Sequence, residues 1–156
     1  ISGNIADENY ASEPWGGGGG IYNEDSEVTL QNSIIAGNTD PAELDQSPDV
    51  FGAGISLGGN LIGDGTGSTG WLPDDLVGNA ASPINPKLGI VGFYEPGTTP
   101  TFPLLVGSPA IDAVDCLPSV MFDQRGVARP QGLTCDIGAF ELVPPTWYQF
   151  LPIILR

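Results

Sequence analysis

The chain has 156 residues, which is enough for one domain with its own core and too few for two comfortable ones. Hydrophobic residues make up 40%, which argues against disorder, and 23 Gly and 15 Pro spread along the chain favour many short strands joined by tight turns over helices. The formal net charge of −15, with only four Lys and Arg residues, excludes a nucleic-acid binder and disfavours an anionic membrane surface.

A four-residue pattern, an aliphatic residue followed by any residue and then Gly-Asn, recurs along the first half of the chain. Its asparagines are separated by 34, 22 and 19 positions: Asn4, Asn38, Asn60 and Asn79. Spacings of about 20 residues fit one coil of a parallel β-helix, whereas a helical repeat would hold a constant period. We therefore predict an all-β fold over residues 1–81, namely a right-handed, single-stranded parallel β-helix (solenoid).

Physical chemistry supports a coil at each repeat. The aliphatic residue is expected to point into the core, and glycine permits the positive φ of a sharp corner. Asparagine tolerates left-handed geometry, and its amide can hydrogen-bond to the asparagine one coil away. The long first step predicts an insertion at residues 7–15, and the glycines at 16–20 predict a turn into a strand at 21–23. Alternating polar and apolar residues over 27–34 predict a half-buried strand.

The chain starts at Ile1, inside a repeat, and we interpret it as a processed form or a fragment. A first coil that opens in this way leaves strand edges and core uncovered. Head-to-tail stacking on another subunit would cover them and would propagate into a filament. A piece cut from a longer solenoid is the alternative interpretation.

Residues 82–141 are dense in Pro and Gly and lose the repeat, so we predict that they cap the last coil within the same domain. Cys116 and Cys135 lie 19 positions apart, and the chain has no His, so a zinc site is not expected. A structural disulfide in an oxidising compartment is the better account, worth about 3 kcal/mol on the chain-entropy model. Free cytosolic thiols are the alternative.

Residues 142–156 are predicted to form a short stiff linker and an apolar tail. The tail is far shorter than the roughly 20 residues of a membrane-spanning helix, and Pro152 opposes a helix, so we expect an extended strand and no membrane span. Pairing with the sheet edge of a neighbouring subunit is the hypothesis for this tail; folding back onto its own cap, or a sorting signal, are the alternatives. The residues assigned to self-association are Trp147, Tyr148, Phe150, Leu151, Ile153, Ile154 and Leu155.

Two groups of segments resemble known families. Residues 18–23 and 32–38 resemble the surface β-helix repeats of polymorphic outer-membrane proteins. The second group resembles the choice-of-anchor Q domain: SPINPKLG at 82–89, GSPAIDA at 107–113, DQRG at 123–126 with RP at 129–130, and CDIGAFE at 135–141. The resemblance covers most of positions 16–141 and departs from the family pattern at 95–103. It implies a secreted bacterial cell-surface protein with no catalytic residues to transfer.

Enzymatic and metal chemistry were weighed against this interpretation. The tripeptide at 38–40 matches one polygalacturonase motif, but the other motifs of those enzymes do not follow it. Asp123, Arg125 and Arg129 suit a lyase or, as we prefer, buried ion pairs that hold the Pro/Gly-rich segment in shape. Calcium is a candidate ligand without an assigned site, and its candidate carboxylates are Asp74, Asp75, Asp112, Asp115 and Asp136.

These patterns favour a non-enzymatic extracellular structural protein without a cofactor. We expect its partner to be a second copy of itself, in a surface assembly or filament built by end-to-end stacking and docking of the tail. A surface adhesin is the first alternative, with glycans as its partner and with Trp15 and Tyr22 stacking on sugar rings. A polysaccharide lyase or hydrolase on a β-helix is the second alternative.

Overall fold

The structure is a computed structural model that describes residues 1–4, 19–39 and 49–145. Within those ranges the chain is all-β, with short strands and no helix. None of the described segments is therefore a helix that could cross a membrane. The predicted insertion at 7–15 and the predicted tail strand lie outside the described residues.

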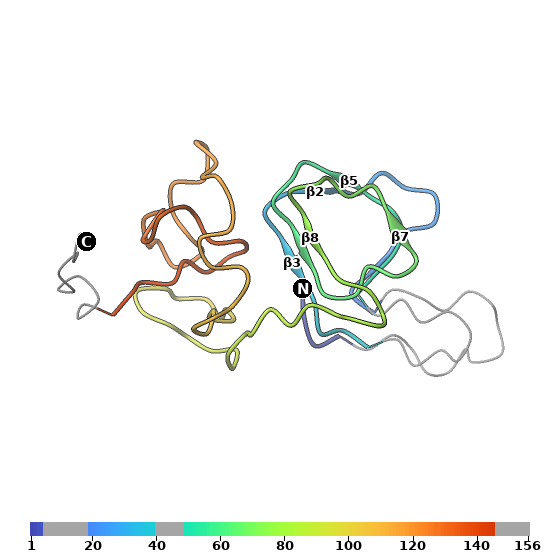
Figure 1. The fold of residues 1–156 in the computed structure, drawn as a ribbon. Coiled ribbons are helices and arrows are strands. Elements are labelled where there is room, and N and C mark those ends of the chain that lie inside the picture. Colours follow the sequence, from blue (N-terminus) through green and yellow to red (C-terminus); the bar gives the residue numbers. More distant parts are fainter. Residues whose placement is uncertain (5–18, 40–48, 146–156) are drawn as a thin grey trace, which may run out of the picture.

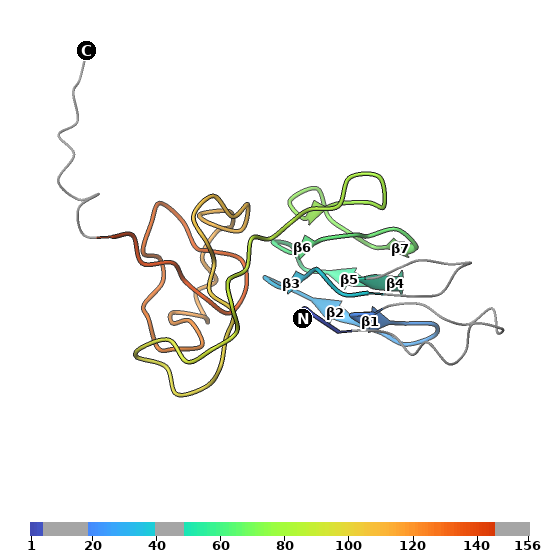
Figure 2. The same ribbon diagram turned by 90° about the horizontal axis from the view of Figure 1, so that it is seen from below.

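The strands follow one another in a repeating order. The first turn of the chain contains β1 (Ile21–Tyr22), β2 (Thr29–Leu30) and β3 (Ile34–Ile35), the second contains β4 (Val50–Ala53), β5 (Ile55–Ser56) and β6 (Leu61–Ile62), and the third contains β7 (Ser68–Thr69) and β8 (Leu76–Val77). They form three parallel sheets, ordered β1-β4-β7, β2-β5 and β3-β6-β8. Successive turns therefore visit the same sheets in the same order, around three sides of a common interior (Figure 1) and as stacked layers (Figure 2).

The register of the third sheet explains why these turns stack. Ile34 pairs with Leu61, which is 27 positions further along, and Leu61 pairs with Leu76, which is 15 positions further. The number of residues per turn thus varies, while apolar side chains return to the same place in each turn. Ile35 and Ile62 are fully buried and form one core cluster with Val50. Burial of such side chains is worth roughly 1.5–3 kcal/mol each.

Residues 27–34 do not form the single strand that their alternation predicts. β2 ends at Leu30, the chain turns at Asn32 with φ of 45°, and β3 begins at Ile34. The corner is held from the next turn, because Asn32 N donates to Gly58 O at 3.2 Å and Ser33 N donates to Asn60 Oδ1 at 3.0 Å. Asparagine tolerates this left-handed conformation better than most residues, so a corner forms where the pattern alone predicts continuity.

Gly52, within β4, shows how closely consecutive turns approach. Its φ is 91°, and a Cβ atom placed on it would lie 1.7 Å from the backbone oxygen of Asn23 in the turn below. Only glycine satisfies both the left-handed backbone and this approach. Asn23 itself is buried and donates from Nδ2 to Ala53 O at 2.5 Å, which ties the two turns together.

Residues 82–145 form a lobe built from loops and isolated antiparallel bridges, and this part of the chain contains no strand. In both views the lobe lies beside the stacked turns, next to β3 and β6, and Gly138 N donates to the backbone and side-chain oxygens of Asn32. A cap would lie across the end of the last turn, so the position of this lobe differs from the predicted one. The physical reason is a shared core, because Leu61 and Ala36 of the turns pack with Ile137 and other apolar side chains of the lobe.

Candidate functional site

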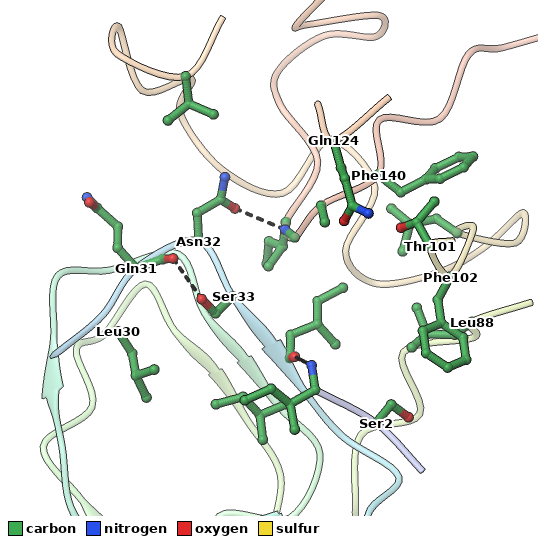
Figure 3. A pocket seen from close by; sticks show the side chains of 18 of the residues that line it. Ser2, Leu30, Gln31, Asn32, Ser33, Leu88, Thr101, Phe102, Gln124 and Phe140 are labelled. Carbon is green, nitrogen blue, oxygen red and sulfur yellow. Dashed lines mark hydrogen bonds between the residues drawn. The ribbon is translucent and has the colours of Figure 1, made fainter. Parts of the chain in front are cut away.

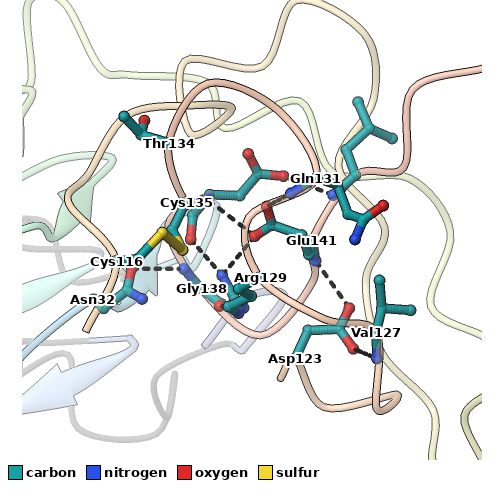
Figure 4. A network of polar contacts seen from close by, with 12 residues as sticks. Asn32, Cys116, Asp123, Val127, Arg129, Gln131, Thr134, Cys135, Gly138 and Glu141 are labelled. Carbon is teal, nitrogen blue, oxygen red and sulfur yellow. Dashed lines mark hydrogen bonds and ion pairs between the residues drawn. A yellow bond between two sulfur atoms is a disulfide. The ribbon is translucent and has the colours of Figure 1, made fainter. Parts of the chain in front are cut away.

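The predicted disulfide is present, joining Cys116 to Cys135 with their Cα atoms 5.0 Å apart. It lies beside a buried network of polar contacts (Figure 4). The surrounding chain lacks the hydrogen-bond ladders of a sheet, yet buried backbone groups must still find partners. Charged side chains supply those partners here, as the preference for structural ion pairs at Asp123, Arg125 and Arg129 predicts.

Arg129 is the centre of the first half of this network. Its Nη1 donates to Glu141 Oε2 at 2.9 Å and to Asp136 O at 2.7 Å, and its Nη2 donates to Gly138 O. The side chains of Arg129 and Glu141 are almost completely buried. Glu141 also accepts from the N–H groups of Gln131, at 2.9 Å, and Asp136, at 3.1 Å. One ion pair therefore binds four backbone groups, which belong to Gln131, Asp136 and Gly138.

Arg125 forms the second half. Its Nη2 and Nε atoms donate to Asp123 Oδ2 at 2.7 and 2.9 Å, and Nη2 also donates to Glu141 O at 2.6 Å. Its guanidinium carbon lies 3.5 Å from the centroid of the Phe140 ring, a cation–π contact. Asp123 accepts two further N–H bonds from Val127 and Glu141, both at 3.0 Å. The network thus reaches an aromatic side chain that faces a groove.

Burial raises the pKa values of the carboxyl groups in this network, whereas hydrogen bonds from N–H donors lower them. Desolvation by burial raises the pKa of Glu141 and of Asp136, although backbone N–H donors and Arg129 oppose the shift. Desolvation would also raise the pKa of Asp123, but the donors from Glu141, Arg125 and Val127 outweigh it and hold that pKa below its ordinary value. Backbone N–H groups donate to all three carboxylates, so the network holds the backbone of this region in place.

A groove of about 620 Å³ runs between the first turn and the lobe (Figure 3). Leu104, Ile137 and Phe140, all buried, belong to its lining on the lobe side, and Leu30 and Ile34 line it from the turns. Val91 and Val120 line it as well and are 50% and 38% exposed. Its polar groups are largely engaged within the chain: Ser33 Oγ donates to Gln31 O at 2.9 Å, and Gln124 Nε2 donates to Pro100 O at 3.0 Å. The groove therefore offers mainly apolar surface.

The asparagines of the sequence repeat do not form one continuous stack. Asn4 Nδ2 donates to Asn38 Oδ1 at 2.9 Å, so these two corners lie one turn apart as the repeat requires. Asn60, in contrast, directly precedes β6, and it contacts Ser33 and Asp75 on the neighbouring turns. Asn79 Oδ1 accepts the N–H groups of Ala81 and Ser82 at 3.0 and 3.1 Å, in a local turn.

The shift at Asn60 has a physical reason. Leu57, the aliphatic residue of its repeat, is 54% exposed, whereas the position that pairs with Ile35 belongs to the fully buried Ile62. Core packing sets the register of a strand, so a Gly-Asn pair displaced by five residues takes another role. Asn60 Nδ2 there donates to Asp75 Oδ1 at 3.0 Å and to Ser56 Oγ at 2.9 Å.

The carboxylates considered for calcium divide into two groups. Asp75 and Asp136 bind backbone N–H groups: Asp75 accepts from Asn60 at 2.8 Å and from Leu72 at 2.7 Å, and Asp136 from Asp112 at 2.8 Å. Asp74, Asp112 and Asp115 line a second pocket of about 460 Å³ beside Leu57. Among the described residues, no three His, Cys, Asp or Glu side chains form a group that could hold a metal ion.

Sequence reasoning missed three features of this region. Asp49, a buried carboxylate, accepts from Asn38 at the corner that the tripeptide at 38–40 marks. Glu141 was quoted within a family motif, but nothing in the chain marked it as the partner of Arg129. The groove depends on side-by-side packing of distant segments, for which a sequence carries no local signal. The tail residues assigned to self-association lie outside the described part of the chain.

Comparison with protein-family models, with curated proteins and with solved structures yields no match for this chain.

Proposed function

We propose that the stacked strands belong to a right-handed parallel β-helix, and that the chain is a non-enzymatic structural protein of the bacterial cell surface that associates with further copies of itself. A family relationship to choice-of-anchor Q proteins is part of this proposal, on the sequence segments quoted above. The observation that carries the proposal is the edge formed by β1 and β2. Among the described residues, β1 pairs only with β4 and β2 only with β5.

Such an edge is a template for another turn. Ile55 N and Leu57 N each donate at 2.8 Å, to Val28 O and Leu30 O respectively. In a parallel pair, the residue between two such acceptors directs its own N–H and C=O to the opposite side. Thr29 therefore presents these groups away from β5, where a strand of a second copy could pair with them. Repetition of that head-to-tail contact gives a filament.

The contacts of the carboxylates support a structural role. Those of Asp75, Asp123, Asp136 and Glu141 accept bonds from backbone N–H groups, and two of the four also form buried ion pairs. A glycosidase requires two carboxylates free to face one glycosidic bond. The disulfide is consistent with an oxidising, extracellular compartment.

Electron microscopy and sedimentation of the purified full chain test the proposal. Elongated assemblies that grow with protein concentration are expected, and the Thr29→Pro variant should shorten them because it removes an N–H group from the edge that no described strand covers. Dispersed monomers at every concentration would contradict the proposal.

A glycan-binding adhesin is a second candidate, favoured by one observation. The rings of Tyr22 and Phe51 stack on consecutive turns with centroids 5.2 Å apart and planes 7° from parallel, and Tyr22 is 40% exposed. Exposed aromatic rings bind sugars by stacking. Saturable glycan binding that the Tyr22→Ala variant loses, without polymer formation, would support this function over the first.

A further inference from the structure

The groove between the first turn and the lobe is lined mainly by apolar side chains, some exposed and some buried. Leu30 and Ile34 line it from the turns, Phe102 and Phe140 line it from the lobe, and the exposed Val91 contributes to it as well. Its volume of about 620 Å³ lies within the roughly 300–1,000 Å³ typical of ligand sites. A concave site lined mainly by apolar side chains is a candidate binding site.

The chain itself contains a segment with matching chemistry. Residues 147–155 include seven apolar or aromatic side chains and Pro152, with no acidic residue, and Arg156 follows them. The whole chain carries a net charge of −15, so this stretch is electrostatically unlike the rest of the molecule. An uncharged apolar segment followed by a cation can approach an acidic body without the repulsion that other surfaces would meet.

The path of the last described residues favours a second copy over the same chain. Both views show residues 142–145 leaving the lobe on the side away from the stacked turns, whereas the groove faces the turns. Pro144 and Pro145 stiffen the chain at this exit, because consecutive prolines favour an extended conformation. A return to the groove of the same chain would require a reversal around the lobe immediately after them.

We propose that residues 147–155 of one copy dock in the groove of a second copy, which places the receptor surface for the tail on the side of the β-helix rather than at its end. This inference rests on the proposed self-association. Alternate apolar side chains of an extended segment would enter the groove, with Phe102 and Phe140 as aromatic partners. Pro152 suits such a segment because docking by side chains does not require every backbone N–H.

Sedimentation velocity of the full chain over a wide concentration range tests the groove directly. Val91→Glu and Val120→Glu place a charge in the groove at exposed positions, so the fold should persist, as far-UV circular dichroism would verify. Each should raise the concentration of half-association by about tenfold or more, because a buried unpaired charge strongly disfavours binding. Val106→Glu is the matched control: Val106 is 83% exposed, does not line the groove and should leave association unchanged.

Deleting residues 147–156 should match the groove variants, and a synthetic peptide of residues 146–156 should compete with assembly.

The outcomes separate this inference from the proposed function. If the unmodified chain forms filaments and both groove variants form them equally well, the inference is wrong and the structural function stands. Closed dimers that the groove variants dissociate would support the groove and contradict the filament. A chain that is monomeric at every concentration would overturn both.

Discussion

Arg129 donates hydrogen bonds to buried backbone carbonyl groups that, in a sheet, would bind the backbone of a neighbouring strand. Its guanidinium group contacts Glu141 and two carbonyl groups in a buried part of the lobe that has no sheet. A planar fork with several donors can bind three acceptors together, whereas an ammonium group is a compact point charge on a flexible stem. The local fold therefore depends on the shape of the guanidinium group as well as on its charge.

Arg129→Lys should lower the free energy of unfolding by about 1–3 kcal/mol, because an ammonium group cannot donate from one planar fork to Glu141 and to two carbonyl groups, and it leaves buried acceptors unpaired. Urea unfolding followed by circular dichroism measures this loss. Lys87→Gln is the control: Lys87 is exposed, and its replacement should change the free energy by less than about 0.5 kcal/mol. Equal stability of the two variants would show that the network does not stabilise the lobe.

The carboxyl group of Asp123 predicts sensitivity to acid. Hydrogen bonds hold its folded-state pKa below the ordinary value, so the stability it contributes is fully present above about pH 4 and is lost as the pH falls through the lowered pKa. Urea unfolding at several pH values between about 2 and 5 measures the loss. Asp123→Asn should be less stable at neutral pH and should show a weaker dependence on pH across this interval. An unchanged slope would assign the acid sensitivity to other groups, such as Asp75, whose pKa is also lowered.

At the scale of the strands, the alternation of polar and apolar residues over 27–34 correctly indicated which side chains are more buried. It wrongly indicated one continuous strand, because β2 and β3 are separate. Most strands here contain only two residues, so a corner falls within any window long enough to show a period. Inward residues such as Ile35 were predictable from the aliphatic-x-Gly-Asn repeat, and β1 from the run of glycines before it. The corner at Asn32 was not, because it depends on hydrogen bonds from the next turn, which no local pattern records.

Gly52→Ala tests the close approach of consecutive turns. The new methyl group would collide with the backbone oxygen of Asn23, in addition to the strain of a positive φ. Gly126 separates the two effects, because its φ is 85° but nothing lies within 4 Å of a Cβ atom placed there. We expect Gly126→Ala to cost about 1 kcal/mol and Gly52→Ala clearly more. Thermal unfolding of both variants measures the difference, and equal costs would mean that the turns can separate without penalty.

For the molecule as a whole, the core joins the turns and the lobe. Ala36 and Leu61 come from the turns, whereas Leu104, Ala110, Ile137 and Phe140 come from the lobe. The sequence predicted one domain and a Pro/Gly-rich second half, but it placed that half across the end of the turns. Its lateral position, and with it the groove, follows from three-dimensional complementarity between segments about 100 residues apart, such as Asn32 and Gly138. Repeat patterns carry no information on such contacts.

Ile137→Ala tests whether the two parts unfold together. Ile137 is fully buried in the shared cluster, so the change should cost about 2–5 kcal/mol. Hydrogen exchange should then accelerate at Leu61 and Leu76 in the turns as well as within the lobe, because a shared core couples their unfolding. Leu133→Ala, at a position that is 92% exposed, should leave exchange unchanged. Acceleration confined to the lobe would show that the turns are stable without it.

The bridge between Cys116 and Cys135 has a consequence for proteolysis of the chain. The loop that it encloses carries exposed side chains, including Met121 at 62% and Leu133 at 92%, and is open to attack. A single cut anywhere between the two half-cystines leaves both fragments covalently tethered. A nicked molecule would therefore migrate as one band on a non-reducing gel and separate into two only after a reductant is added.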